Sequence, residues 1–304
     1  KQRNDALIMT QKIPDSSTSP RWQTDGAGIR LLTKEQYASL AKELPKGDVL
    51  LRGLSHIRYS KEENFSSCSQ GLIHVPHKRL SFGFYFDARQ LLLIDSGTSR
   101  ELAGALERLA PNLPARSTPA CLLLRLLELL IADDLPMLQQ TEERLSKLED
   151  ELLRRTPEHF YETIIAFRKE LSGYHSYYEQ MGTLGEQLQQ CLCLTMDEEQ
   201  VRNWQLYINR TDRLHDHCER LREYLLQIRE LYQSQIEVRQ NKIMTFLTVV
   251  TTIFLPLTLI VGWYGMNFPD MFALRWRYGY PAVILISVGV VAAEIIYFHK
   301  KKML

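Results

Sequence analysis

The sequence predicts an α+β protein with transmembrane α-helices, in three parts, and three observations lead to this prediction. Short runs rich in β-branched and aromatic residues mix with helical patterns over residues 1–118, which indicates a small α/β domain. Residues 119–242 have the pattern of long amphipathic helices, a bundle and stalk. Residues 243–304 contain two apolar stretches of about 20 residues each, the length that crosses a bilayer.

In the first part, strands are expected over residues 71–76, 80–86 and 90–95, and the last two are close enough to form a hairpin. Amphipathic helices are expected over residues 33–44 and 99–109. We therefore expect a sheet with helices packed against it.

Long helices begin at Thr118. The first is expected over Thr118–Arg155, Pro157 restarts a second, and a third begins near Asp197 after the possible cap Thr195. Neither Pro nor Gly interrupts the chain from Asp197 to Leu255. One helix is therefore expected to run from the soluble part into the membrane.

Charge is distributed unevenly along the 304 residues, although 37 Lys and Arg nearly balance 36 Asp and Glu. No such residue lies between Lys242 and Asp270, and only Glu294 lies between Arg277 and His299. The net charge of +1 gives no reason to expect a nucleic-acid partner. The five cysteines form no disulfide framework, so we expect the soluble part to be cytosolic.

The two spans are expected over Ile243–Trp263 and Tyr280–Phe298. Basic residues are more numerous just before the first span and just after the second span than in the short link between the spans. This positive-inside bias predicts that both termini are cytoplasmic. Glu294, within the second span, is expected to pair or to reach the inner interface, with a role in proton coupling as the alternative.

Polar and small residues form one seam on the first span, at alternating spacings of three and four. The seam consists of Asn241, Met244, Thr248, Thr251, Leu255, Thr258 and Gly262. The bulky remainder, expected to face lipid, consists of Phe246, Val249, Val250, Ile253, Phe254, Leu257 and Ile260. Because one helix cannot enclose a pore, the seam predicts several identical copies around an axis.

Acidic residues continue the seam backward at intervals of seven: Asp216, Glu223, Glu230 and Glu237. In a symmetric assembly each would become a ring of carboxylates lining a wet passage. The solvated face of an amphipathic helix explains the same spacing equally well.

The run Tyr264–Phe268, YGMNF, resembles the signature of CorA magnesium channels. The stretches IFLPLTLIVGWYGMNF and RWRYGYP and the closing lysines are also similar to that family. The close match covers Asn241–Leu304, and upstream only the order of parts is similar.

The resemblance implies a homopentamer in the cell (inner or plasma) membrane, in contact with lipid, that admits hydrated Mg²⁺ and related divalent cations. Asn267 would meet the ion through its water shell, and Tyr264, Gly265 and Met266 would shape the same mouth. By the same resemblance, the pore would be lined by Asn241, Met244, Thr248, Leu255, Thr258 and Glu230, while the spacing adds Thr251, Gly262, Glu223 and Glu237. Mg²⁺ is implied as cargo and regulator, and no other cofactor is expected.

Two alternatives remain open. A ZntB-like zinc transporter, possibly proton-coupled, shares the architecture; Met266 argues for magnesium and leaves zinc, cobalt and nickel open as cargo. A non-conducting membrane scaffold is the other. An enzyme is not expected, because the sequence contains no Walker motif, nucleophile triad or glycine-rich phosphate loop.

Overall fold

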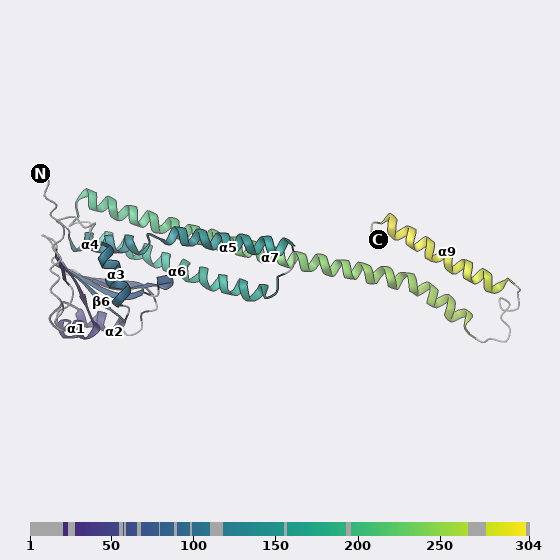
Figure 1. The fold of residues 1–304 in the computed structure, drawn as a ribbon, viewed down its shortest axis with the longest axis horizontal. Helices are drawn as coiled ribbons and strands as arrows, with labels where there is room; N and C mark the ends of the chain where they lie inside the picture. The colour runs from purple at the N-terminus through teal and green to yellow at the C-terminus, as the bar shows by residue number, and fades with distance from the viewer. Residues whose placement is uncertain are drawn as a thin grey trace. The chain divides into compact units, whose positions relative to one another are not determined.

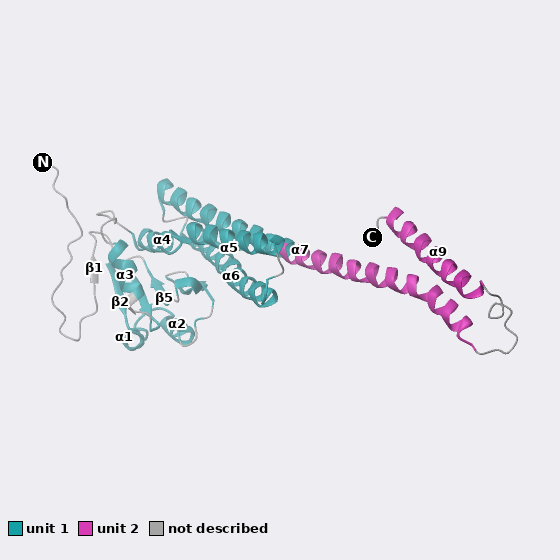
Figure 2. Cartoon of the chain, turned by 45° about the vertical axis from the view of Figure 1, so that its right-hand side comes forward, with its two compact units in different colours: residues 1–227 teal, residues 228–304 magenta. Residues whose placement is uncertain are grey.

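The computed structural model describes residues 21–23, 28–54, 57, 59–65, 68–78, 80–87, 90–97, 99–109, 118–154, 157–192, 196–266 and 278–301. The chain, drawn in Figure 1, divides into two compact units, residues 1–227 and residues 228–304 (Figure 2). The expected boundaries after residues 118 and 242 follow changes in sequence pattern and remain predictions.

A six-stranded mixed sheet forms the centre of the first unit. The strands are β1 (Arg21–Gln23), β2 (Gly28–Leu32), β3 (Lys61–Asn64), β4 (Ser69–Val75), β5 (Leu80–Phe86) and β6 (Gln90–Asp95). Their order is β1-β2-β6-β5-β4-β3, and only the β2–β6 pair is parallel. The three expected strands and the β5–β6 hairpin are confirmed.

Strand β3 was not predicted, because its sequence KEEN lacks the apolar alternation of a strand. Its pairing with β4 places Glu62 opposite Gly71. A Cβ at Gly71 would lie 2.4 Å from the carbonyl oxygen of Lys61 and 2.6 Å from the Phe84 ring, so only glycine fits there. The neighbouring strand, rather than local propensity, therefore makes β3 a strand.

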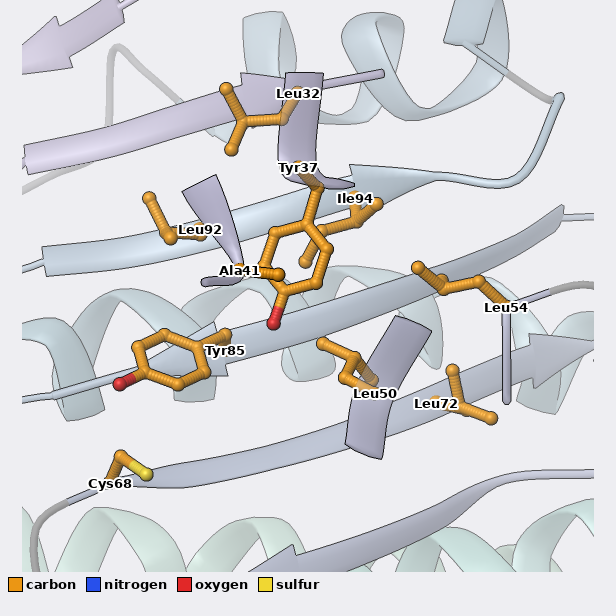
Figure 3. Close-up of a cluster of buried hydrophobic side chains, with 10 residues drawn as sticks. All are labelled: Leu32, Tyr37, Ala41, Leu50, Leu54, Cys68, Leu72, Tyr85, Leu92 and Ile94. Atoms are coloured by element: carbon orange, nitrogen blue, oxygen red, sulfur yellow. The ribbon is translucent and has the colours of Figure 1, made fainter. Parts of the chain in front are cut away.

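Helices α1 (Lys34–Leu40) and α2 (Gly47–Gly53) cover one face of the sheet (Figure 3). Thr33 and Gln36 form a capping box that starts α1. Beneath the helices, Tyr37 lies among Leu50, Tyr85 and Ile94, and its hydroxyl donates to the carbonyl of Gly47 at 3.2 Å. These buried apolar side chains hold the short helices on the sheet.

The helix expected over residues 33–44 ends at Leu40, and α2 was not predicted. A Cβ at Gly47 would lie 2.5 Å from the carbonyl oxygen of Ala41, so the chain turns back tightly here. Lys46, just before α2, has a positive φ of 59°. This tight return shortens the expected helix and starts a second one.

Helices α3 (Ser99–Leu109), α4 (Pro119–Leu130) and α6 (Phe160–Leu192) contact the sheet as well. The helix expected over residues 99–109 is confirmed. Thr118 caps α4, because its side chain accepts a hydrogen bond from the backbone N–H of Cys121 at 3.2 Å. The bundle thus starts where the sequence pattern changes.

The single helix expected over Thr118–Arg155 is two helices, α4 and α5 (Asp134–Arg154), separated by a turn. Asp134 is fully buried at this turn, with its Oδ1 3.0 Å from His77 Nε2 and 3.7 Å from Lys78 Nζ. The Lys78 ammonium also donates to the carbonyl of Leu130, the last residue of α4. Polar contacts with the distant 3₁₀ turn Pro76–Lys78 therefore accompany the turn between α4 and α5. The spacing of apolar residues in the sequence does not reveal these contacts.

Helix α7 runs without interruption from Glu198 to Tyr264 and continues through Pro256. Asp197 caps it by accepting from the N–H of Gln200 at 2.7 Å, while the possible cap Thr195 lies outside the described residues. α7 packs closely on α6, since a Cβ at Gly185 would lie 2.9 Å from the ring of Tyr207. The expected continuous helix is confirmed.

Helix α9 (Gly279–Lys300) follows in the second unit and, in both views, runs back along the distal part of α7 (Figures 1 and 2). By length and composition, α7 and α9 are the two described helices able to cross a membrane. Both expected spans are therefore present as helices.

A buried acid on β3 makes the stability of the first unit depend on pH. Both carboxyl oxygens of Glu62 are buried. This burial raises the pKa of Glu62 from 4.5 to about 8. The folded chain therefore retains a proton that the unfolded chain releases, and stability falls as the pH rises from about 4.5 to about 8.

We expect Glu62→Gln to raise the free energy of unfolding by about 1–2 kcal/mol above pH 8, and to change it little near pH 4. The figure lies below the full value of the pKa shift because solvent screens part of it. Thermal unfolding of the full chain in detergent across this pH range measures the effect. Glu63→Gln, at the partly exposed neighbour, is the control. An unchanged pH profile for Glu62→Gln would contradict the interpretation.

Candidate functional site

The polar seam of α7 is uncovered in the second unit. All seven seam residues are exposed, and the apolar members Met244 and Leu255 expose 60% and 71% of their surface. Phe246 and Phe254, outside the seam, are exposed to a similar degree, so the seam is free to contact either lipid or another copy of the chain. The structure thus places the predicted pore-lining residues on a common, open face.

The face of α7 opposite the seam is more covered. At 100° per residue, Thr245, Val249, Ile253 and Ile260 lie on the far side of the helix from Thr251. Val249 is buried and the other three are half-buried. On α9 the less exposed residues recur every three or four positions, as single residues or adjacent pairs: Gly279, Ala282, Val283, Ser287, Val290, Val291, Glu294 and Phe298. We infer that these two faces pack together.

This arrangement corrects the expectation that the bulky side of the first span faces lipid. Val249 is only 6% exposed, and Ile253 and Ile260 are half-buried on the α9 side. Phe246 and Phe254 are exposed, in agreement with a lipid-facing position. The bulky residues thus divide between helix packing and an open surface, and the sequence of α9, apolar nearly all round, carries no signal of this division.

Threonine hydroxyls on the seam donate to their own helix. Thr248 donates to the carbonyl of Met244 at 2.8 Å, Thr251 to that of Leu247 at 2.9 Å, and Thr258 to that of Phe254 at 2.7 Å. Each hydroxyl proton is therefore used within the helix, and oxygen lone pairs remain for other partners. A row of acceptor oxygens is suited to the water shell of a cation.

The acidic stripe is open as well. Glu223, Glu230 and Glu237 are exposed, and none forms an ion pair with another described residue. In the first unit the opposite face of α7 is packed, since Leu214, Leu221 and Leu225 are buried. The stripe therefore lies on the unpacked side, as both explanations of its spacing require.

Asp216, the first acid of the stripe, and its neighbour Glu219 have partners. Glu219 lies 2.9 Å from both His175 and Arg222, and Asp216 lies 3.7 Å from His215. Asp216 therefore has a partner within its own helix, unlike the three acids that follow it on the stripe. The carboxylates of those three, Glu223, Glu230 and Glu237, are left available to mobile ions.

At the end of α7, the last described residues form the beginning of the expected mouth. Gly265 donates to the carbonyl of Val261 at 2.8 Å, and a Cβ at this position would lie 2.9 Å from the same oxygen, which explains the need for glycine. The side chains of Tyr264 and Met266 are exposed. Asn267 lies outside the described residues, so its role remains a prediction.

Comparisons with known proteins agree with this architecture. The model of the CorA-like Mg²⁺ transporter protein family matches residues 52–300. The cobalt/magnesium transport protein CorA of Thermotoga maritima is 28% identical over 183 residues, 60% of this chain and 52% of that protein. The chain thus aligns with about half the length of this curated relative. The magnesium transport protein CorA of Wolinella succinogenes is 46% identical over 77 residues, which are 25% of this chain and 24% of that protein.

Solved structures show the same fold. The complete CorA magnesium transporter from Methanocaldococcus jannaschii has a TM-score of 0.75 at 22% identity and covers 90% of each chain. The ZntB cytoplasmic domain from Vibrio parahaemolyticus has a TM-score of 0.56 at 14% identity, over 73% of this chain and 95% of that one. With the family match covering most of the sequence and two apolar C-terminal helices in place, the chain belongs to the CorA-like Mg²⁺ transporter family.

Proposed function

We propose that this chain is one subunit of a homopentameric channel through which hydrated Mg²⁺ enters the cytoplasm. The observation that carries the proposal is that α7 has two different faces in the second unit. The face toward α9 is partly covered, and the polar seam on the opposite face is exposed. Copies of α7 that turn their seams toward a common axis would enclose a pore, with the α9 helices outside. Both termini then lie in the cytoplasm, in agreement with the positive flanks of the spans.

The chemistry of the seam suits a hydrated divalent ion. Mg²⁺ releases its water reluctantly, so a lining that accepts hydrogen bonds from the water shell costs less than one that replaces it. Thr248, Thr251 and Thr258 offer such acceptors, because their protons are held by backbone carbonyls. Met244 and Leu255 would form apolar rings between them, which close a narrow pore by dewetting.

At the two ends of this passage, different groups would meet the ion. At the outer end, the amide of Asn267 would hydrogen-bond the water shell without the tight binding of a carboxylate. At the inner end, rings of Glu223, Glu230 and Glu237 would concentrate cations by their summed field. The membrane potential supplies the drive, about 4.6 kcal/mol for a divalent ion per 100 mV.

A zinc transporter is the second candidate, because the fold of a ZntB cytoplasmic domain resembles that of this chain. Uptake of Mg²⁺ and Zn²⁺ by the same proteoliposomes, with and without a pH gradient, distinguishes the two. A scaffold that does not conduct would move neither ion.

Replacement of the three seam threonines by valine should reduce Mg²⁺ flux by about tenfold or more, since a barrier increase of about 1.4 kcal/mol has this effect. Valine keeps the shape but removes the acceptor oxygens. Flux into proteoliposomes loaded with a Mg²⁺ indicator measures the change. Thr245→Val, on the α9 side of the same helix, is the matched control.

Wild type and both of these variants should have the mass of five copies by light scattering in mild detergent. If the seam and control variants conduct equally, the seam does not line the conduction path. A monomer that still conducts would overturn the pentameric arrangement.

Neutralisation of Glu223, Glu230 and Glu237 to Gln should lower conductance most at low ionic strength, because salt screens the field of the rings. Stability should be unchanged or higher, because repulsion between like charges is relieved. Single-channel or flux measurements across a salt series test this. Three exposed acids elsewhere, Glu143, Glu151 and Glu158, provide a control of equal charge. Equal conductance of both triple variants at low salt would show that the stripe faces bulk solvent.

Asn267→Ala should abolish Mg²⁺ uptake or reduce it by about a hundredfold, while the pentamer remains assembled. The expected cause is the loss of the amide oxygens that meet the hydrated ion. Uptake and oligomer mass are measured together, so that loss of assembly is recognised. Asn209→Ala, at an exposed position in the soluble part of α7, is the control. Normal uptake by Asn267→Ala would favour the scaffold alternative.

A further inference from the structure

Buried polar side chains gather where the 3₁₀ turn Pro76–Lys78 meets the helical bundle of the first unit. Asp134, the first residue of α5, has no exposed side-chain surface, and the side chain of His77 in the turn is 10% exposed. Tyr177 and Tyr178 on α6 are 2% and 1% exposed. These four side chains, from three separate segments, form a polar cluster that the proposed conduction path does not use.

Ring and ion-pair contacts place the four side chains of the polar cluster against one another. His77 Nε2 lies 3.0 Å from Asp134 Oδ1. The His77 and Tyr177 rings meet edge to face with 5.8 Å between their centroids, and the Tyr177 and Tyr178 centroids are 5.1 Å apart. Burial, and then the nearby carboxyl of Asp134, raise the pKa of the Tyr178 hydroxyl, so these two groups are also neighbours.

The polar atoms of the cluster are buried and form no hydrogen bond with the described residues. They are both ring nitrogens of His77, both carboxyl oxygens of Asp134 and the hydroxyls of Tyr177 and Tyr178. The 3.0 Å contact between His77 and Asp134 lacks the alignment of a hydrogen bond. Lys78 Nζ, 3.7 Å from Asp134 Oδ1, is beyond hydrogen-bond range and donates to the carbonyl of Leu130. Six polar atoms are therefore close together without direct bonds.

A protein interior rarely leaves so many polar atoms unbonded. Each unpartnered group loses its hydrogen bonds to bulk water and gains none in return, and six such losses would offset much of the stability of a domain. Native structures satisfy such groups with bound water or ions. The cluster therefore indicates a ligand small enough to lie among its polar atoms.

The cluster contains both hydrogen-bond donors and acceptors, and this mixture identifies the class of ligand. Burial raises the pKa of the Tyr177 and Tyr178 hydroxyls, so both keep their protons and can donate. Asp134 has at least one oxygen that can only accept, in either protonation state. Water both donates and accepts, and a buried water molecule typically forms about three hydrogen bonds. It can therefore bond to the hydroxyls and to the carboxyl together.

Ions fit this set of atoms less well. A metal ion binds lone pairs, whereas the tyrosine O–H groups and Lys78 Nζ offer hydrogens. The described part of the chain also contains no group of three His, Cys, Asp or Glu side chains able to hold a metal. An anion would lie against the carboxyl of Asp134. Water is the ligand that satisfies every member of the cluster.

We propose that the polar cluster is a binding site for ordered water, which carries the hydrogen bonds between the turn Pro76–Lys78, the start of α5 and α6. The water donates to the Asp134 carboxyl and accepts from the Tyr177 and Tyr178 hydroxyls. It exchanges beside Lys78, whose side chain is 26% exposed. The sheet is thereby joined to the bundle through hydrogen bonds that re-form when the segments shift slightly. The assignment is independent of the ion that the protein carries.

X-ray radiolysis of the wild-type full chain in detergent tests the site, because hydroxyl radicals formed from bound water oxidise the side chains beside it. Mass spectrometry should find Tyr177 and Tyr178 oxidised although both are buried. Tyr37 is the matched control, because it is equally buried and its hydroxyl donates to the carbonyl of Gly47 at 3.2 Å. Oxidation of Tyr177 and Tyr178 no greater than that of Tyr37 would overturn the proposal.

Tyr178→Phe distinguishes bound water from a dry cluster by the sign of its effect on stability. If water bonds to the hydroxyl, its loss should lower the Tm of the full chain by about 2–4 °C. In a dry cluster the same change removes an unsatisfied group, so a Tm that is unchanged or higher contradicts the water site. Tyr59→Phe, at a side chain that is 54% exposed, is the control and should leave the Tm unchanged.

The radiolysis experiment uses only the wild type and therefore does not depend on the folding of a variant. A chain that transports no Mg²⁺ but shows oxidation at Tyr177 and Tyr178 would contradict the proposed function and leave the water site intact.

Discussion

Helix α7 has to bury one side and leave the opposite side open along its length, and much of the structure depends on that division. In the first unit Leu221 and Leu225 are buried while Glu223 on the other side is exposed. In the second unit Val249 is buried while Thr251 is exposed. In both parts, residues of the same character recur at intervals of seven, which is close to two turns of the helix. Polar and apolar residues therefore stay on separate faces.

The need for internally satisfied backbone groups shapes the part of α7 that enters the membrane. It accounts for an unbroken helix and for threonine hydroxyls that donate back to carbonyls one turn earlier. Pro256, which lacks an N–H, is accommodated in the same helix on the half-covered side. The hydrogen bonds that stabilise the span thus also determine which atoms its seam offers to an ion.

Two buried carboxyl groups illustrate two responses to the cost of burial. Asp134 lies beside His77 and Lys78, and this cluster joins the sheet to the turn between α4 and α5. Burial raises the pKa of the Tyr178 hydroxyl, and the nearby carboxyl of Asp134 raises it further. Glu62 has a pKa raised to about 8, so it stays neutral near neutral pH. Their environments differ, and so do the means by which each remains in the fold.

The sequence by itself determined the order of parts, the β5–β6 hairpin, the continuous helix and both spans, because each depends on a local period or on length. It also determined which residues share the seam, since spacing on one helix requires no partner. Only the tertiary structure decided that β3 is a strand, that α4 and α5 are separate, and which side of α7 is covered by α9. These features depend on contacts between residues far apart in the chain, such as Glu62 with β4 or Asp134 with His77. A local pattern records the face that a helix can bury, but only the packed neighbour decides which face is buried.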